Sequence, residues 1–245
     1  MKKILALWAI PRSTSTAFER MMRERGDFLV CDEPFGLSFY YSPDRCNTTR
    51  YLEAELDPSN SFNSVLEKLK QENEKQPVFI KDMAYHIDPI VSPKFLSHFE
   101  NTFLIRNPAK SLPSLFNGWP DFNQKEAGYT SLYQLFEIVR KMRGNAPVLI
   151  DSDDLVQKPK ATIQAYCKAL DLPFIEESLE WKPEPQSEIN QWEGGWHTYV
   201  QSSTEFKERI NRDYVIIKDN EHLRQSYEFC LPYYKKLYEY RLLIE

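Results

Sequence analysis

An arginine followed by four hydroxyl residues lies between a short apolar run, residues 4–10, and a segment with a helical pattern. The five residues are Arg12, Ser13, Thr14, Ser15 and Thr16. A helix N-terminus favours an anion through its free N–H groups and its positive dipole end, and hydroxyl groups add short donors. A guanidinium matches the oxygens of a phosphate or sulfonate. The segment therefore indicates an anion-binding loop, with a hydroxyl-rich helix cap beside a surface arginine as the alternative.

A second cationic site is indicated at TFLIRNPAKSLPSL, residues 102–115. Arg106 ends a predicted strand, and Ser114 lies eight residues later on the helix that follows. Because the C-terminal ends of parallel strands gather at one edge of a sheet, Arg106 and the 12–16 loop would face a common crevice if their strands are neighbours. The alternative is a structural turn in which Asn107 and Pro108 start the helix. Two such sites together suit a ligand with two anionic ends.

Apolar runs alternate with helical patterns along most of the chain. We expect strands over residues 4–10, 28–31, 78–81, 102–106 and 147–151, and helices over residues 61–75, 108–117, 126–143 and 162–170. This alternation predicts an α/β fold with three layers, α/β/α, around a central, mostly parallel sheet. Because the chain has no Ser/Gly linker and no internal repeat, we expect one domain over residues 1–245. It would include an irregular C-terminal flap around 176–200 and a terminal helix around 219–243.

The composition argues against several common classes of protein. Only 7 of the 245 residues are glycine, and the loops GxGxxG and GxxxxGK[ST] are absent, which excludes a standard dinucleotide enzyme and a standard P-loop NTPase. A net charge of −5 argues against nucleic acid as a partner. The four cysteines are widely spaced, so we expect neither a zinc site nor a disulfide framework. No apolar run approaches the roughly 20 residues of a membrane-spanning helix, and we expect a soluble, cytoplasmic protein with no membrane partner.

The two cationic segments together resemble a known family. PRSTSTAFERM (residues 11–21) and FLIRNPAKSLPSL (residues 103–115) are similar to the two signature motifs of sulfotransferases that use 3′-phosphoadenosine 5′-phosphosulfate (PAPS). The resemblance implies that residues 12–16 hold the 5′-phosphosulfate and that Arg106 and Ser114 bind the 3′-phosphate. Residues 150–174 and 231–242 also resemble segments of this family. The chain departs from it at Thr14, where the family often has glycine, because a β-branched residue disfavours a positive φ.

The resemblance implies two catalytic residues besides Arg12. Glu33, in VCDEPFG, lies 21 residues after Arg12, where some members have a glutamate that acts as the general base. A carboxylate there would take the proton from the acceptor. Asp32 is the alternative base, because alternation along a strand would point the two side chains to opposite faces. Lys81, which ends a predicted strand, resembles a family lysine that stabilises charge on the bridging oxygen of the leaving group; a solvent-exposed lysine is the alternative.

Two further groups are candidates for the surroundings of this site. His86, Tyr40 and Trp119 are candidates for an acceptor pocket, with a structural histidine and core aromatic residues as the alternative. Gly194 and Gly195 are the only adjacent glycines, and they lie in the predicted flap. Because members of the family use a C-terminal segment to cover the nucleotide, the resemblance implies such a cover here.

The sequence thus predicts a PAPS-dependent sulfotransferase acting on a hydroxyl group, with an amine as the second choice, of a small molecule. Positioning and charge stabilisation suffice for this transfer, so we expect no metal. The alternative from another class is a non-catalytic nucleotide-binding or interaction protein on the same fold. A P-loop-type small-molecule kinase is the alternative among enzymes, and it would need a lysine in the loop and a Mg²⁺ ligand on a nearby strand.

Overall fold

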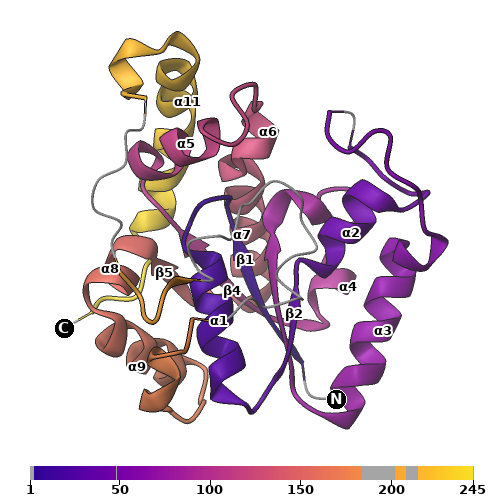
Figure 1. The fold of residues 1–245 in the computed structure, drawn as a ribbon. Helices are drawn as coiled ribbons and strands as arrows, with labels where there is room; N and C mark the ends of the chain where they lie inside the picture. Colours follow the sequence, from indigo (N-terminus) through magenta and orange to yellow (C-terminus); the bar gives the residue numbers. More distant parts are fainter. Residues whose placement is uncertain (1–2, 48, 184–201, 208–214, 245) are drawn as a thin grey trace.

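The computed structural model describes residues 3–47, 49–183, 202–207 and 215–244, and the statements below concern these residues. Within them, a central sheet of five parallel strands has the order β2-β3-β1-β4-β5 (Figure 1). The strands are β1 (Ile4–Ala9), β2 (Leu29–Asp32), β3 (Val78–Met83), β4 (Phe99–Ile105) and β5 (Leu149–Asp151). This sheet confirms the predicted α/β fold class.

Helices connect the strands and flank the sheet, and Figure 1 shows α1 beside the sheet with α8 and α9 next to it. The helices are α1 (Ser15–Arg25), α2 (Pro34–Tyr41), α3 (Phe62–Lys75), α4 (Pro93–Leu96), α5 (Pro108–Phe116), α6 (Gln124–Ala127), α7 (Tyr129–Arg143), α8 (Ser152–Gln157), α9 (Pro159–Ala169) and α11 (Glu221–Tyr238). Short 3₁₀ helices are η1 (Pro58–Asn60), η2 (Ala84–Ile87), η3 (Glu176–Leu179) and η5 (Ile217–Asp219).

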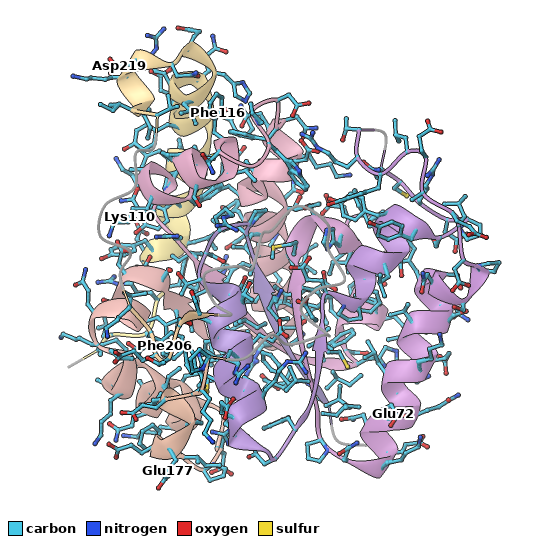
Figure 2. The ribbon with its side chains drawn as sticks, in the orientation of Figure 1. Glu72, Lys110, Phe116, Glu177, Phe206 and Asp219 are labelled. Atoms are coloured by element: carbon cyan, nitrogen blue, oxygen red, sulfur yellow. The ribbon has the colours of Figure 1, made fainter. Side chains whose placement is uncertain are left out.

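The central strand β1 explains why both faces of the sheet are covered. Every residue of β1 is buried. One set of alternate residues, Ile4, Ala6 and Trp8, belongs to a core shared with α3, α5, α7 and α11. The other set, Leu5, Leu7 and Ala9, belongs to a core shared with α1 and α9. Phe206, labelled in Figure 2, is part of the second core. Because side chains alternate along a strand, an entirely apolar strand needs a layer on each face.

The sheet topology brings two chain segments of interest to one edge. β1 pairs with β4 in parallel, with Ala9 opposite Leu104, so the two strands end side by side. β1 continues into residues 10–14 and α1, and β4 continues into Arg106 and α5. On its other side β1 pairs with β3. Ligands of open α/β sheets bind at this kind of edge, where connections leave neighbouring strands in opposite directions.

Two of the predicted boundaries that the structure corrects affect the site. The helix expected over 126–143 is divided into α6 and α7 at Gly128, whose φ is 82°. A Cβ at Gly128 would lie 3.2 Å from Cδ of Pro11, so glycine lets the start of α7 approach the loop after β1. The strand expected over 78–81 continues to Met83, which places Lys81 inside β3 and not at its end.

Beyond residue 183, the structure describes two segments, residues 202–207 and 215–244. α11 lies within the range 219–243 expected for a terminal helix. Most of the flap expected around 176–200, including Gly194 and Gly195, lies outside the described residues.

Candidate functional site

The loop after β1 has an unusual backbone at two non-glycine residues. Arg12 has a φ of 63° and Thr14 a φ of 71°, both in the left-handed region. Thr14 therefore adopts the conformation that its β-branched side chain was expected to disfavour, at a cost of about 1–3 kcal/mol for such a residue. The family resemblance places a glycine at this position, which has the same backbone freedom without that cost. The backbone of the loop is therefore left-handed at Thr14, the conformation that glycine adopts most easily.

Hydroxyl groups of this loop hold its shape. Oγ of Ser13 donates a hydrogen bond to the carbonyl oxygen of Ile10 at 2.7 Å. Thr14 precedes α1, yet its side chain makes no capping hydrogen bond to the helix. Its Oγ1 lies 2.7 Å from Oγ of Ser152, at the start of α8. The side chain of Thr14 thus links the loop to the residue after β5 and does not cap α1. Arg12 lies two residues before Thr14, next to the N-terminus of α1.

Arg12, Arg106 and Ser114 are brought together at the ends of β1 and β4. Nε of Arg12 donates to Oγ of Ser114 at 2.9 Å, and Nη1 of Arg106 donates to the carbonyl oxygen of Arg12 at 2.6 Å. Burial, together with the charge of Arg106, lowers the pKa of Arg12 to about 10. Two like charges near each other in a partly buried site favour a bound anion, because an anion offsets their repulsion.

Buried hydroxyl groups fix the position of the second arginine. The hydroxyl of Tyr129 donates to the carbonyl oxygen of Arg106 at 2.8 Å, and it lies 2.6 Å from Oγ of Ser111 on α5. Tyr129 is the first residue of α7, which Gly128 brings against the loop after β1. The helix break at Gly128 therefore contributes to the geometry of both arginines.

The end of β5 adds acidic and basic groups beside the loop. Asp151 caps α8 by accepting the N–H of Asp153, and its other oxygen accepts the hydroxyl of Tyr234 on α11 at 3.1 Å. Burial raises the pKa of Asp151 to about 6. Lys110, labelled in Figure 2 where α5 begins, forms an ion pair of 2.9 Å with Asp153. These contacts connect α5 to α8 and α11 to the end of β5.

Glu33, Asp32 and Lys81 form a buried charged cluster on the other side of β1. Nζ of Lys81 lies 2.7 Å from Oε1 of Glu33 and also contacts Asp32. The expectation that Asp32 and Glu33 point to opposite faces is wrong, because Glu33 lies beyond β2 and has a left-handed backbone with φ 42° and ψ 51°. This turn directs both carboxyl groups to the same ammonium. Lys81 is fully buried, so the alternative of a solvent-exposed lysine is wrong as well.

Sequence reasoning missed Glu19, the third carboxyl group of this cluster. Glu19 lies on α1 with its side chain fully buried, and its Oε2 is 3.4 Å from Nζ of Lys81. Its Oε1 accepts hydrogen bonds from Nε and Nη2 of Arg23, at 3.1 and 2.8 Å. The available signal was a glutamate next to the apolar residues Phe18 and Met21 of the predicted helix, on the side that must face the sheet.

The candidate acceptor residues pack against both hydrophobic cores. The hydroxyl of Tyr40 is 3.1 Å from that of Tyr85, and both side chains belong to a buried aromatic cluster. Nδ1 of His86 is 2.7 Å from Asp82, and the ring of His86 packs on Tyr40. Trp119, after α5, has the guanidinium of Arg50 4.6 Å from its ring centroid. Tyr40 thus belongs to one hydrophobic core, on which His86 packs, and Trp119 packs against the other core.

The described residues contain neither a membrane-spanning helix nor a cluster of metal ligands. In the described part of the chain, no helix is long and apolar enough to cross a membrane. Within the same residues, no group of three or more His, Cys, Asp or Glu side chains is arranged to hold a metal ion. In the cluster of Glu19, Asp32 and Glu33, the ammonium of Lys81 occupies the position between the carboxyl groups.

The chain is similar to known proteins over most of its length. The family model described as the sulfotransferase domain matches residues 1–238. Two proteins of Arabidopsis thaliana, named branched-chain-amino-acid aminotransferase-like proteins 2 and 1, are 28% and 29% identical over 219 residues. The matched segment is 83% of this chain and 36% of each relative. The chain therefore spans about a third of the length of the curated relatives it matches.

Solved structures share the fold. The sulfotransferase domain from the curacin biosynthetic pathway has a TM-score of 0.52 at 14% identity, covering 94% of this chain and 97% of that one. The sulfotransferase domain of the Synechococcus PCC 7002 olefin synthase has a TM-score of 0.53 at 17% identity, covering 99% and 96%. Sulfotransferase STF9 from Mycobacterium avium has a TM-score of 0.50 at 12% identity, covering 94% and 76%.

Proposed function

Given that this chain belongs to the sulfotransferase domain family, we propose that it transfers a sulfuryl group from PAPS to a hydroxyl group of a small molecule. In this reaction a sulfur–oxygen bond forms to the acceptor and the bond from sulfur to the bridging oxygen breaks. The electron pair of that bond stays on the 5′-phosphate, which leaves as 3′-phosphoadenosine 5′-phosphate (PAP). The acceptor proton passes to a base of the protein.

The contact between the two cationic motifs supports the proposal most directly. Arg12 donates to Ser114 and Arg106 donates to the backbone of Arg12, so one hydrogen-bonded group spans the ends of β1 and β4. The residues fit a ligand with two anionic ends, because the two guanidiniums repel each other and the N-terminus of α1 lies beside them. In the proposal, Arg12 and residues 13–16 hold the phosphosulfate, and Arg106 and Ser114 hold the 3′-phosphate.

Glu33 is the proposed general base. Its side chain is 10% exposed and is held by an ion pair of 2.7 Å with Lys81, which fixes the direction of the carboxylate. A hydroxyl group attacks sulfur poorly unless its proton is removed as the new bond forms, and a positioned carboxylate accepts that proton. Glu33 lies at the end of β2, in the same sheet as the arginine loop and separated from β1 by β3.

Arg12 and Lys81 are the proposed sources of positive charge for the leaving group. Arg12 belongs to the loop that would hold the phosphosulfate, so its guanidinium offsets charge that develops on the bridging oxygen. Lys81 adds a buried positive charge beside Glu33. For Lys81 to contact the bridging oxygen directly, its ammonium must turn away from one of the carboxyl groups when the donor binds.

Calorimetry and an acceptor screen test this function together. The protein should bind PAP more tightly than adenosine 5′-phosphate, because the second cationic site recognises the 3′-phosphate. It should also transfer radioactive sulfate from labelled PAPS to at least one member of a panel of phenols, alcohols and amines. Equal affinity for the two nucleotides would rule out the proposal. Tight binding of PAP without transfer to any acceptor would favour a non-catalytic nucleotide-binding protein.

A further inference from the structure

Three carboxyl groups meet one ammonium group in the buried cluster beside β1. Glu19 comes from α1, Asp32 from the end of β2, and Glu33 from the residue that follows. Nζ of Lys81 contacts all three, and the exposed fractions of the Glu19, Asp32 and Lys81 side chains are 0%, 1% and 0%. The arrangement connects the helix of the anion-binding loop to the proposed base.

The charges of this cluster do not balance when every group is ionised. Arg23 adds a second positive charge through its two hydrogen bonds to Glu19. Three negative charges then stand against two positive ones in a site that water hardly reaches. Carboxylates that share a buried site cannot all ionise easily, because each disfavours the charge on its neighbours. One proton on one carboxyl group makes the cluster neutral.

The surroundings of the three groups differ. Glu19 lies between two cations, Lys81 and Arg23, and these outweigh the effect of its burial to hold the pKa of Glu19 below its usual value. Glu33 is the most exposed of the three and has the ion pair of 2.7 Å with Lys81. Burial, followed by the neighbouring charge of Glu19, raises the pKa of Asp32 well above its usual value. Asp32 is therefore the group in which the negative charge is least favourable.

A buried oxygen atom supports the same assignment. Within the part of the chain that the structure describes, Oε2 of Glu19 is buried and accepts no hydrogen bond, although it lies 3.4 Å from Nζ of Lys81 in an ion pair. Leaving such an acceptor unsatisfied costs about 1–3 kcal/mol or more. A protonated Asp32 supplies the missing donor, since its side chain is within hydrogen-bonding reach of Glu19.

We propose that Asp32 carries a proton in the resting protein and donates it in a hydrogen bond to Glu19, which leaves the charge of Lys81 to hold Glu33 as a carboxylate. Asp32 and Glu19 are then positioning residues, which act on the reaction through Lys81 and Glu33. The effect on Glu33 rests on the proposed function, because Glu33 acts as a base only in the proposed sulfuryl transfer. The protonation of Asp32 itself does not depend on any ligand.

Infrared spectroscopy of the whole protein tests the location of the proton. At pH 8, above the pKa of about 6 of Asp151, the spectrum should contain the carbonyl band of a protonated carboxyl group, which shifts in D₂O. Labelling the aspartates with ¹³C should move this band, whereas labelling the glutamates should not. The band should also be absent from Asp32→Asn. The labelling experiment uses the unmodified sequence, so it still assigns the band to an aspartate if that variant fails to fold. The band should persist in Asp151→Asn and Asp88→Asn, which separates Asp32 from the two other aspartates among the described residues whose pKa is raised.

A substitution of Glu19 tests the cause of the protonation. In Glu19→Gln the negative charge beside Asp32 is lost, so the pH at which the band disappears should fall by at least one unit, or about tenfold in proton affinity. Glu24→Gln is the matched control, since Glu24 lies on the same helix, its side chain is 32% exposed, and it pairs with Arg20. The control should leave the midpoint unchanged.

The outcomes separate this inference from the proposed function. A protonated carboxyl band that moves with glutamate labelling would overturn the inference, and so would the absence of any such band or an unchanged midpoint in Glu19→Gln. None of these results would affect the binding of PAP. Conversely, a protein that fails to distinguish PAP from adenosine 5′-phosphate while showing the Asp32 band would overturn the function and leave the inference standing.

Discussion

Arg12 and Ser114, 102 residues apart in the chain, are joined by a hydrogen bond of 2.9 Å from Nε of the arginine to Oγ of the serine. The resemblance assigns these residues to opposite ends of the nucleotide, with Arg12 at the phosphosulfate and Ser114 at the 3′-phosphate. Their contact makes the two assignments parts of one hydrogen-bonded group. A ligand that moves Arg12 therefore acts on Ser114 as well, and binding at the two ends should be coupled.

Replacing Arg106 with alanine should weaken the binding of PAP by about 10- to 150-fold, because a charge-assisted hydrogen bond contributes about 1.5–3 kcal/mol. Calorimetry measures the change. Arg140→Ala, at the end of α7 where the side chain is 37% exposed, is the control and should bind PAP as the wild type does. A loss of the same size for adenosine 5′-phosphate would contradict the assignment of Arg106 to the 3′-phosphate.

Replacing Glu33 with glutamine should lower the rate constant of sulfuryl transfer by about 10²- to 10⁴-fold, the range typical of a lost general base. The affinity for PAP should change little, because the amide keeps the size of the side chain and the arginine loop is untouched. Single-turnover kinetics and calorimetry on the same preparation measure the two quantities. Equal losses of transfer and of PAP binding would refute the role of Glu33 as base.

Replacing Lys81 with methionine should destabilise the fold by about 3–5 kcal/mol, because it removes the ammonium shared by buried carboxyl groups. The free energy of unfolding in urea measures the effect. Lys75→Met is the control, since the side chain of Lys75 is 65% exposed at the end of α3. A change as small as that of the control would mean that Lys81 does not hold the cluster together.

The contribution of Asp151 to the stability of the protein should fall as the pH rises from about 4 to about 6. Burial raises the pKa of Asp151 to about 6, so the unfolded chain releases this proton at a lower pH than the folded protein does. Below the pKa of Asp151 in the unfolded chain, its burial as a neutral group contributes to the free energy of unfolding. This contribution, up to about 3 kcal/mol, is lost as the pH rises through the pKa of Asp151 in the folded protein. The free energy of unfolding, measured in urea at several pH values, should lack this pH-dependent contribution in Asp151→Asn. An equal decline in the wild type and in Asp151→Asn would contradict the prediction.

The strands and the arginine-containing loop after β1 were predictable because their signals are local. A strand buried on both faces is apolar throughout, and β1 has this pattern from Ile4 to Ala9. An arginine followed by hydroxyl residues before a helix is likewise visible in the sequence, as are Arg106 and Ser114 with their spacing. The order of the strands was not visible, and that order decides whether the two motifs meet.

The sequence by itself determined the α/β class, the apolar strands and the two cationic motifs, because period and polarity report directly on burial and local chemistry. Only the tertiary structure decided that Glu33 turns back toward Lys81 through a left-handed backbone and that Glu19 joins it from α1. It also decided that Thr14 accepts a positive φ. Strained dihedral angles and contacts between distant residues depend on the packing that compensates them, and that packing has no local signal in the chain.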